Sequence, residues 1–233
     1  MIKRLVVVSI VLVAIAGCKS YDPDNGWTRI EPAPGFAYYL YESDVPAVWH
    51  PDLFVTFPGY GGGYDNDVRN IIKKYLEKTN KPGIVIAPHT EHKDPAKREF
   101  SIEMTKKAIS SIQHDRLFLL GTSAGAVLAL SLSNEVHADK IVPIVAGAYK
   151  AAGGQPSDHL PTPGCSDVWF LNGYDMDVLQ KYGILWDGTV FVDPAKRLAD
   201  EIGAKMSLVP GLTHSTTIKL LEANDNVLDW LTE

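Results

Sequence analysis

The sequence predicts an α/β fold in which a mostly parallel central sheet carries helices on both of its faces. Two observations lead to this prediction. Short, continuous apolar runs rich in Val, Ile and Leu recur along the chain, as expected of strands that are buried on both faces. These runs alternate with helical patterns of about ten to fifteen residues, and such alternation is typical of a parallel sheet covered by helices.

The elements follow one another in a regular order after an aromatic, β-prone strand at residues 36–41. The other expected strands are residues 53–57, 83–87, 116–120, 140–146, 168–171 and 206–209. The expected helices are residues 65–78, 98–112, 124–135, 194–202 and 217–231. The longest insertion, residues 147–166, is too short for more than a small rim, so we expect little or no cap domain. Ligands of such sheets bind at the C-terminal ends of the strands.

Length and composition restrict the class of protein. The 233 residues, 45% of them hydrophobic, are enough for one domain with a sizeable core. The formal net charge is −6 and no basic run is present, which argues against nucleic acid as a partner. We expect a monomer.

The first residues have the pattern of a secretory signal peptide. Lys3 and Arg4 precede an apolar stretch, residues 5–15, that is too short to span a membrane. The small residues that end in Cys18 resemble the lipobox of bacterial lipoproteins. That resemblance implies cleavage after residue 17, lipidation of Cys18 and attachment to a membrane. Lys19 stands where lipoproteins of the inner membrane often carry Asp, so we expect the outer membrane of a bacterial cell envelope. The alternative is an ordinary cleaved signal with a chance cysteine.

The domain organisation follows from this interpretation. Residues 1–17 are the signal peptide, residues 18–35 a lipidated N-terminus and Pro/Gly-containing tether, and residues 36–233 the folded domain. If Cys18 is lipidated, Cys165 has no cysteine left to pair with. We expect Cys165 to be buried as a small apolar residue.

The segment Gly121-Thr122-Ser123-Ala124-Gly125 is the strongest functional signal. It follows an apolar strand and opens a helix, and this order lets a nucleophilic serine, Ser123, stand clear of the sheet. Glycines are expected on either side of the serine because the turn is tight and the next helix packs closely.

A serine nucleophile needs a base and a group that orients the base. Three of the seven histidines follow Ser123 in the sequence. His137 comes one helix later, away from the strand ends, and His159 lies in a Pro/Gly-rich connection. His214 follows the strand at residues 206–209 through a short loop, so we predict that His214 is the base.

The acid is expected after the strand at residues 168–171. Two aspartates, Asp175 and Asp177, follow this strand, and either could reach the base.

A developing oxyanion needs two backbone N–H groups, one after the nucleophile and one from the loop after an early strand. Ala124 supplies the first, and Tyr60 in the Gly-rich loop at residues 58–63 supplies the second. The loop lacks the spacing of phosphate-binding motifs, so no nucleotide cofactor is expected. The only His/Glu cluster, residues 89–92, lacks metal-ligand spacing and is interpreted as a solvated charge run; we predict no metal and no cofactor.

Together these motifs resemble the α/β-hydrolase superfamily over essentially the whole chain after the tether. The approach from Asp115-Arg116 to the serine resembles compact esterases related to poly(3-hydroxybutyrate) depolymerases and feruloyl esterases. Pro58-Gly59-Tyr60 is similar to the oxyanion loop of cutinase-like polyester hydrolases. The Asp-x-x-Val pattern resembles the family's acid turn and favours Asp175. Two departures are that Pro58 stands where histidine commonly precedes the glycine, and that the acid turn is one residue short.

The resemblance implies a serine esterase that cleaves a small-molecule or polymer ester through an acyl-enzyme. The alternatives are a peptidase or thioesterase of the same fold, or a lipid-anchored binding protein that has lost catalysis. Fold alone cannot decide between an enzyme and a binding protein.

Overall fold

The computed structural model describes most of the chain. The described residues exclude residues 1–17, 23–25, 48–49, 60–62, 66, 93, 147–159, 175–191, 213–218, 220 and 222–224.

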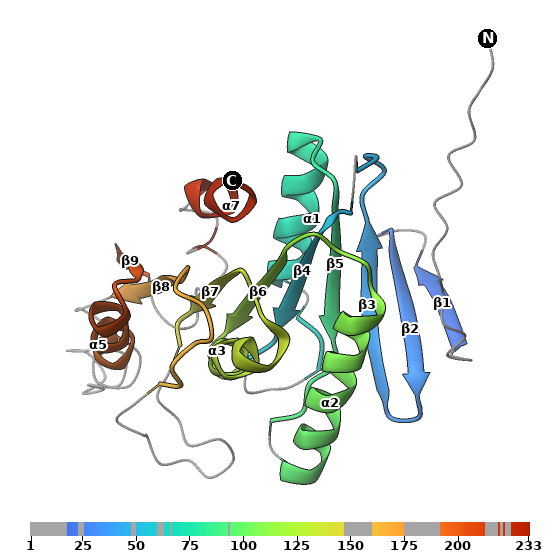
Figure 1. Ribbon diagram of the computed structural model, residues 1–233, viewed down its shortest axis with the longest axis horizontal. Coiled ribbons are helices and arrows are strands. Elements are labelled where there is room, and N and C mark those ends of the chain that lie inside the picture. Colours follow the sequence, from blue (N-terminus) through green and yellow to red (C-terminus); the bar gives the residue numbers. More distant parts are fainter. Residues whose placement is uncertain are drawn as a thin grey trace.

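A nine-stranded sheet forms the centre of the molecule, with strand order β1-β2-β3-β5-β4-β6-β7-β8-β9 (Figure 1). The strands are β1 (Cys18–Asp22), β2 (Trp27–Ala33), β3 (Phe36–Glu42), β4 (Asp52–Phe57), β5 (Gly83–Pro88), β6 (Leu117–Thr122), β7 (Lys140–Ile144), β8 (Trp169–Tyr174) and β9 (Lys205–Pro210). From β5 to β9 all neighbours are parallel, whereas β1, β2 and β3 are antiparallel. The predicted mostly parallel sheet is confirmed.

Helices cover both faces of the sheet, as predicted. They are α1 (Asp67–Thr79), α2 (Pro95–Ser111), α3 (Ala124–Val136), α5 (Asp193–Ile202) and α7 (Asp225–Thr232). Leu53 and Val55 of β4 belong to a core cluster with residues of α2, α3 and α5. Phe54, between them, belongs to a second cluster with residues of α1 and α7. All three side chains are buried, because successive residues of a strand point to opposite faces and both faces are covered.

The helix boundaries follow local capping. Helix α2 begins three residues before the expected start because Asp94 caps it and Pro95 occupies its first turn. The carboxylate of Asp94 accepts hydrogen bonds from the backbone N–H groups of Ala96 and Lys97, at 3.0 and 3.2 Å. Among the described residues, no helix has the length and apolar character that crossing a membrane requires.

The predicted tether at residues 18–35 is wrong, because these residues contribute strands β1 and β2. Trp27 is buried against the ring of Tyr41, with ring centroids 5.7 Å apart, and its indole N–H donates to Asn70 of α1 at 3.1 Å. The glycines that suggested a tether lie at turns instead. Gly26, between β1 and β2, and Gly35, between β2 and β3, have φ of 66° and 81°, which a glycine adopts without strain.

The N-terminal hairpins bring Cys18 to the C-terminal edge of the parallel strands. Lys19 pairs with Ile30, Ile30 with Tyr38, and Tyr38 with Pro88, the last residue of β5. Cys18 lies one residue beyond this row. Figure 1 shows the β2–β3 turn at the same end of the sheet as the arrowheads of β4 and β5.

Candidate active site

The predicted order of strand, turn and helix around Ser123 is confirmed. Strand β6 ends at Thr122, and helix α3 begins at Ala124. Ser123 between them has φ 52° and ψ −113°, a backbone conformation that non-glycine residues rarely adopt. Its N–H donates to the carbonyl of Ile144 at the end of β7 at 2.9 Å, so the neighbouring strand helps to hold the turn. Ser123 is 9% exposed.

The two glycines of the motif allow three backbone segments to meet at this turn. A β-carbon at Gly121 would overlap the carbonyl of Gly125, the second residue of α3. A β-carbon at Gly125 would overlap the carbonyls of Phe57 and Pro58 at the end of β4. The close helix packing that the sequence predicted is therefore present, and it also brings the end of β4 against the start of α3.

Ala124 is well placed for the predicted role of an oxyanion donor. It is the first residue of α3, and the first N–H groups of a helix have no acceptor within the helix. The positive end of the helix dipole adds to the field at this point. A negative oxygen formed beside Ser123 would be stabilised there.

The predicted oxyanion loop starts beside Ser123. A β-carbon built on Gly59 would lie 3.7 Å from the β-carbon of Ser123, which is ordinary van der Waals contact. Tyr60 itself lies outside the described residues. The chain resumes at Gly63, which exchanges two backbone hydrogen bonds of 3.0 Å with Thr90. Both ends of the loop are thus located, one against Ser123 and one against the segment that follows β5.

The segment at residues 89–92 is not the solvated charge run that the sequence suggested. Thr90 is fully buried and His92 is 6% exposed. The Nε2 atom of His92 lies 3.2 Å from the carbonyl oxygen of Pro58 and 3.3 Å from the hydroxyl of Thr90. Burial lowers the pKa of the His92 imidazole, which favours the neutral ring. The sequence did not indicate a role for His92 in the site. The available signal was its position shortly after the expected strand at residues 83–87.

The segments that carry the predicted acid and base begin side by side. Strands β8 and β9 are parallel neighbours. A β-carbon at Gly173, near the end of β8, would overlap the carbonyl of Leu212, two residues after β9 ends. Asp175, Asp177 and His214 all lie outside the described residues. The structure therefore places the origins of these two segments together at the C-terminal edge of the sheet.

A series of backbone hydrogen bonds links Ser123 to these segments. Ser123 donates to Ile144 of β7, and the next residue, Val145, donates to Leu171 of β8 at 2.7 Å. The C-terminal ends of β6, β7, β8 and β9 consequently form one continuous edge.

Arg116, part of the motif that suggested compact esterases, lies at the opposite end of β6 from Ser123. Its guanidinium makes two hydrogen bonds to the carboxylate of Asp52 at the start of β4, at 3.0 and 2.7 Å. Arg116 therefore joins two strand beginnings and does not reach the site.

Asp65 is a buried carboxylate close in sequence to the oxyanion loop. It is 4% exposed, and its Oδ1 accepts the N–H groups of Asp67 and Val68 at the start of α1, both at 3.0 Å. Burial raises the pKa of Asp65 to about 7 in spite of these bonds. The hydrogen bonds give Asp65 the role of a helix cap.

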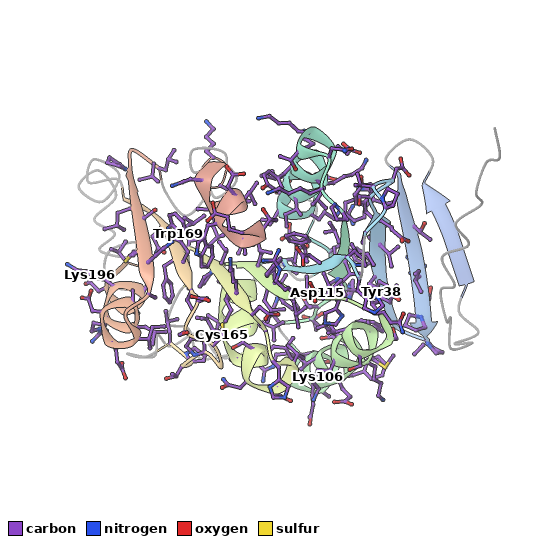
Figure 2. The ribbon with its side chains drawn as sticks, turned by 45° about the horizontal axis from the view of Figure 1, so that its top comes forward. Tyr38, Lys106, Asp115, Cys165, Trp169 and Lys196 are labelled. Carbon is purple, nitrogen blue, oxygen red and sulfur yellow. The ribbon has the colours of Figure 1, made fainter. Side chains whose placement is uncertain are left out.

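Cys165 is half-buried against the core cluster on the α3 face, and not fully buried as expected (Figure 2). Burial raises the pKa of its thiol to about 11, so the thiolate that nucleophilic attack requires is scarce at neutral pH. Within the part of the chain that the structure describes, no group of three or more His, Cys, Asp or Glu side chains is arranged to hold a metal ion.

The arrangement has a serine on a strained turn, a helix N-terminus next to it and a glycine-rich loop beginning at its β-carbon. Comparison with known proteins adds evidence about the fold.

No protein-family model and no curated protein sequence matches the chain. Solved structures do resemble it.

An α/β serine hydrolase homologue from Coxiella burnetii has a TM-score of 0.59 and 13% identity, over 91% of this chain and 100% of that chain. Est1E from Butyrivibrio proteoclasticus has a TM-score of 0.62 and 12% identity, over 89% and 98%. The fluorophosphonate-binding serine hydrolase F of Staphylococcus aureus has a TM-score of 0.56 and 13% identity, over 93% and 97%. At these identities the likeness establishes the fold, and the predicted α/β-hydrolase fold is confirmed.

Proposed function

We propose that this chain, which has the α/β-hydrolase fold, is a serine hydrolase that cleaves a carboxylic ester. The observation that carries the proposal is the strained backbone of Ser123 between β6 and α3, with the start of the Gly-rich loop against its β-carbon. Backbone strain of this kind is found mainly at functional sites, because it costs stability and persists only where the surrounding structure holds it in place. Two of the three described structural neighbours have serine hydrolase in their names, which favours the same class of chemistry.

In the proposed reaction the Ser123 hydroxyl attacks the ester carbonyl while His214 accepts its proton. The oxyanion of the tetrahedral intermediate is bound by the N–H groups of Tyr60 and Ala124. His214 then protonates the leaving alcohol, and the acyl group stays on Ser123. Water, deprotonated by His214, releases the acid and restores the serine. Asp175 holds the imidazole of His214 in the productive tautomer.

Asp177 is the second candidate for the acid, since both aspartates follow β8 within the same segment. Replacing each by Asn distinguishes them. We expect Asp175→Asn to reduce turnover by a factor on the order of 10⁴, as for loss of a triad acid, and Asp177→Asn to reduce it far less. The reverse ranking assigns the acid to Asp177.

An ester is preferred to an amide because the proposed residues include no additional device for protonating an amine leaving group. A peptidase or a thioesterase would use the same residues, and substrate profiling separates the three. The proposed substrate is a small-molecule or polymer ester.

The direct test is labelling with a fluorophosphonate probe together with hydrolysis of p-nitrophenyl esters of increasing acyl length. We expect wild type to be labelled and active, and Ser123→Ala to be neither. Ser131→Ala is the matched control, because Ser131 is an exposed serine on the same helix, α3. A folded wild type that is neither labelled nor active would instead support a binding protein that has lost catalysis.

We further propose that Cys18 is lipidated and attaches the protein to a membrane, in the outer membrane of a bacterial envelope. The lipobox-like sequence before Cys18 supports this. Since β1 starts at Cys18, the acyl chains would join the folded domain without a spacer. Treatment of expressing cells with globomycin should leave the precursor unprocessed, and Cys18→Ser should move the protein from the membrane to the soluble fraction. Unchanged partition of Cys18→Ser would refute the anchor.

A further inference from the structure

The carbonyl of Pro58 is held by a histidine from a distant part of the chain. His92 Nε2 lies 3.2 Å from this oxygen, and the imidazole is buried. A carbonyl can only accept a hydrogen bond, so the Nε2 atom must carry the proton. Burial lowers the pKa of His92 and so favours a ring with one N–H, which the contact with Pro58 assigns to Nε2.

Pro58 is the first residue after β4, and its peptide bond leads directly into the Gly-rich loop. Proline has no N–H, so the carbonyl is its only backbone group for hydrogen bonding. The same carbonyl lies against Gly125 of α3, where a β-carbon would overlap it. The orientation of the Pro58–Gly59 peptide is therefore defined from two sides, by His92 and by α3.

The other end of the loop depends on the same short segment. Gly63 pairs with Thr90 through two backbone hydrogen bonds, and the Thr90 hydroxyl lies 3.3 Å from His92 Nε2. Residues 90–92 thus hold both ends of the loop at residues 58–63. This loop contains Tyr60, whose N–H is proposed to bind the oxyanion.

We propose that His92 is a positioning residue for the oxyanion hole. It acts through the Pro58 carbonyl, and the inference rests on the proposed hydrolase function. His92 comes from the segment after β5, and its Nε2 atom reaches the backbone carbonyl at the point where β4 leads into the loop. The oxyanion forms only when the serine attacks. A displaced N–H donor therefore weakens binding of the transition state more than binding of the ester substrate.

A matched pair of variants tests the role of the hydrogen bond. His92→Gln places an amide N–H near the position of Nε2, whereas the shorter side chain of His92→Asn cannot reach Pro58. Both substitutions leave a buried amide, so they impose a similar cost on folding. We expect His92→Asn to lower kcat by about tenfold or more and to change KM by less than about threefold. Small displacements of catalytic groups lower the rate of the chemical step strongly. We expect His92→Gln to recover most of the lost kcat.

Three measurements accompany the kinetics: the midpoint of thermal unfolding, the rate of fluorophosphonate labelling, and the activity of wild type. Equal kcat in the Gln and Asn variants, whether normal or reduced, would overturn the positioning role. It would show that kcat does not depend on whether the side chain at position 92 can reach the Pro58 carbonyl. A loss that appears in KM alone would overturn it as well. The labelling rate gives the same comparison if either variant folds poorly, because it reports on folded molecules only. If wild type is neither labelled nor active, the proposed function fails first and this inference fails with it.

Discussion

The backbone of Leu212 lies so close to Gly173 that a β-carbon at position 173 would overlap the Leu212 carbonyl. Gly173 is the last residue but one of β8, and Leu212 follows β9 by two residues. The proposed acid comes two residues after Gly173, and the proposed base two residues after Leu212. The absence of a side chain at position 173 thus lets the two segments start in contact.

Replacing Gly173 by Ala should therefore separate these segments. We expect stability to fall by about 1–3 kcal/mol, as in other overpacked sites, and kcat/KM to fall more than the loss of folded protein explains. Gly203→Ala is the control, because Gly203 has φ 69° at the end of α5 and nothing within 4 Å of an added β-carbon. It should lower stability through backbone strain and leave kcat/KM unchanged. Urea unfolding and ester kinetics on both variants check the prediction, which fails if Gly173→Ala retains full kcat/KM.

The strained backbone of Ser123 predicts that activity and stability conflict at this residue. Ser123→Gly should remove both the nucleophile and the cost of φ 52°, and so raise the free energy of unfolding by about 1 kcal/mol relative to Ser123→Ala. Ser123→Ala removes the hydroxyl but keeps the strain, so it is the matched comparison. Chemical denaturation of the two inactive variants measures the difference. A Gly variant less stable than the Ala variant would show that the turn is not strained.

The buried carboxyl of Asp65 predicts a dependence of stability on pH. Its pKa is raised to about 7 in the folded protein by burial, whereas in the unfolded chain it is about 4. Between these values the unfolded chain is ionised and the folded one is protonated, so stability falls as pH rises from about 4 to about 7. Asp65→Asn keeps an oxygen to cap α1 and has no charge.

We therefore expect Asp65→Asn to gain stability over wild type as pH rises, by up to about 4 kcal/mol at pH above about 7. Unfolding by urea at about pH 4 and about pH 8 measures the gain. Asp94→Asn is the control for losing a carboxylate at a helix start, because Asp94 caps α2 through similar bonds near the surface. A constant difference between Asp65→Asn and wild type across this range would contradict the prediction.

The position of Cys18 predicts that a lipid anchor would hold the C-terminal edge of the sheet near the bilayer. Cys18 is one residue from the row that ends at Pro88 of β5, and Ser123 lies at the same edge. A flexible Gly/Ser spacer inserted after Cys18 should therefore reduce hydrolysis of an ester embedded in vesicles and leave hydrolysis of a soluble ester unchanged. Cys18→Ser, without an anchor, sets the baseline. Equal vesicle activity with and without the spacer would show that this edge is not held against the membrane.

The sequence alone was enough to predict the alternation of strands and helices, because strands buried on both faces need continuous apolar runs. It was also enough to place Ser123 on a turn between a strand and a helix, since that motif is local and its glycines are adjacent to it. It did not reveal that residues 18–35 contribute two strands. A glycine in a tight turn and a glycine in a tether give the same local signal, and only the pairing of the strands distinguishes them.

The contacts of His92 with Pro58 and of Gly173 with Leu212 join residues more than thirty positions apart. Local pattern cannot encode them, since they depend on which strand ends the sheet order brings together. Only the tertiary structure shows that β5 lies beside β4, and β9 beside β8. This order lets the segment after β5 contact the segment after β4, and the segment after β9 contact the end of β8. For this chain, the sequence therefore predicted the turn that carries the proposed nucleophile, whereas the groups that orient its surroundings became visible only in the fold.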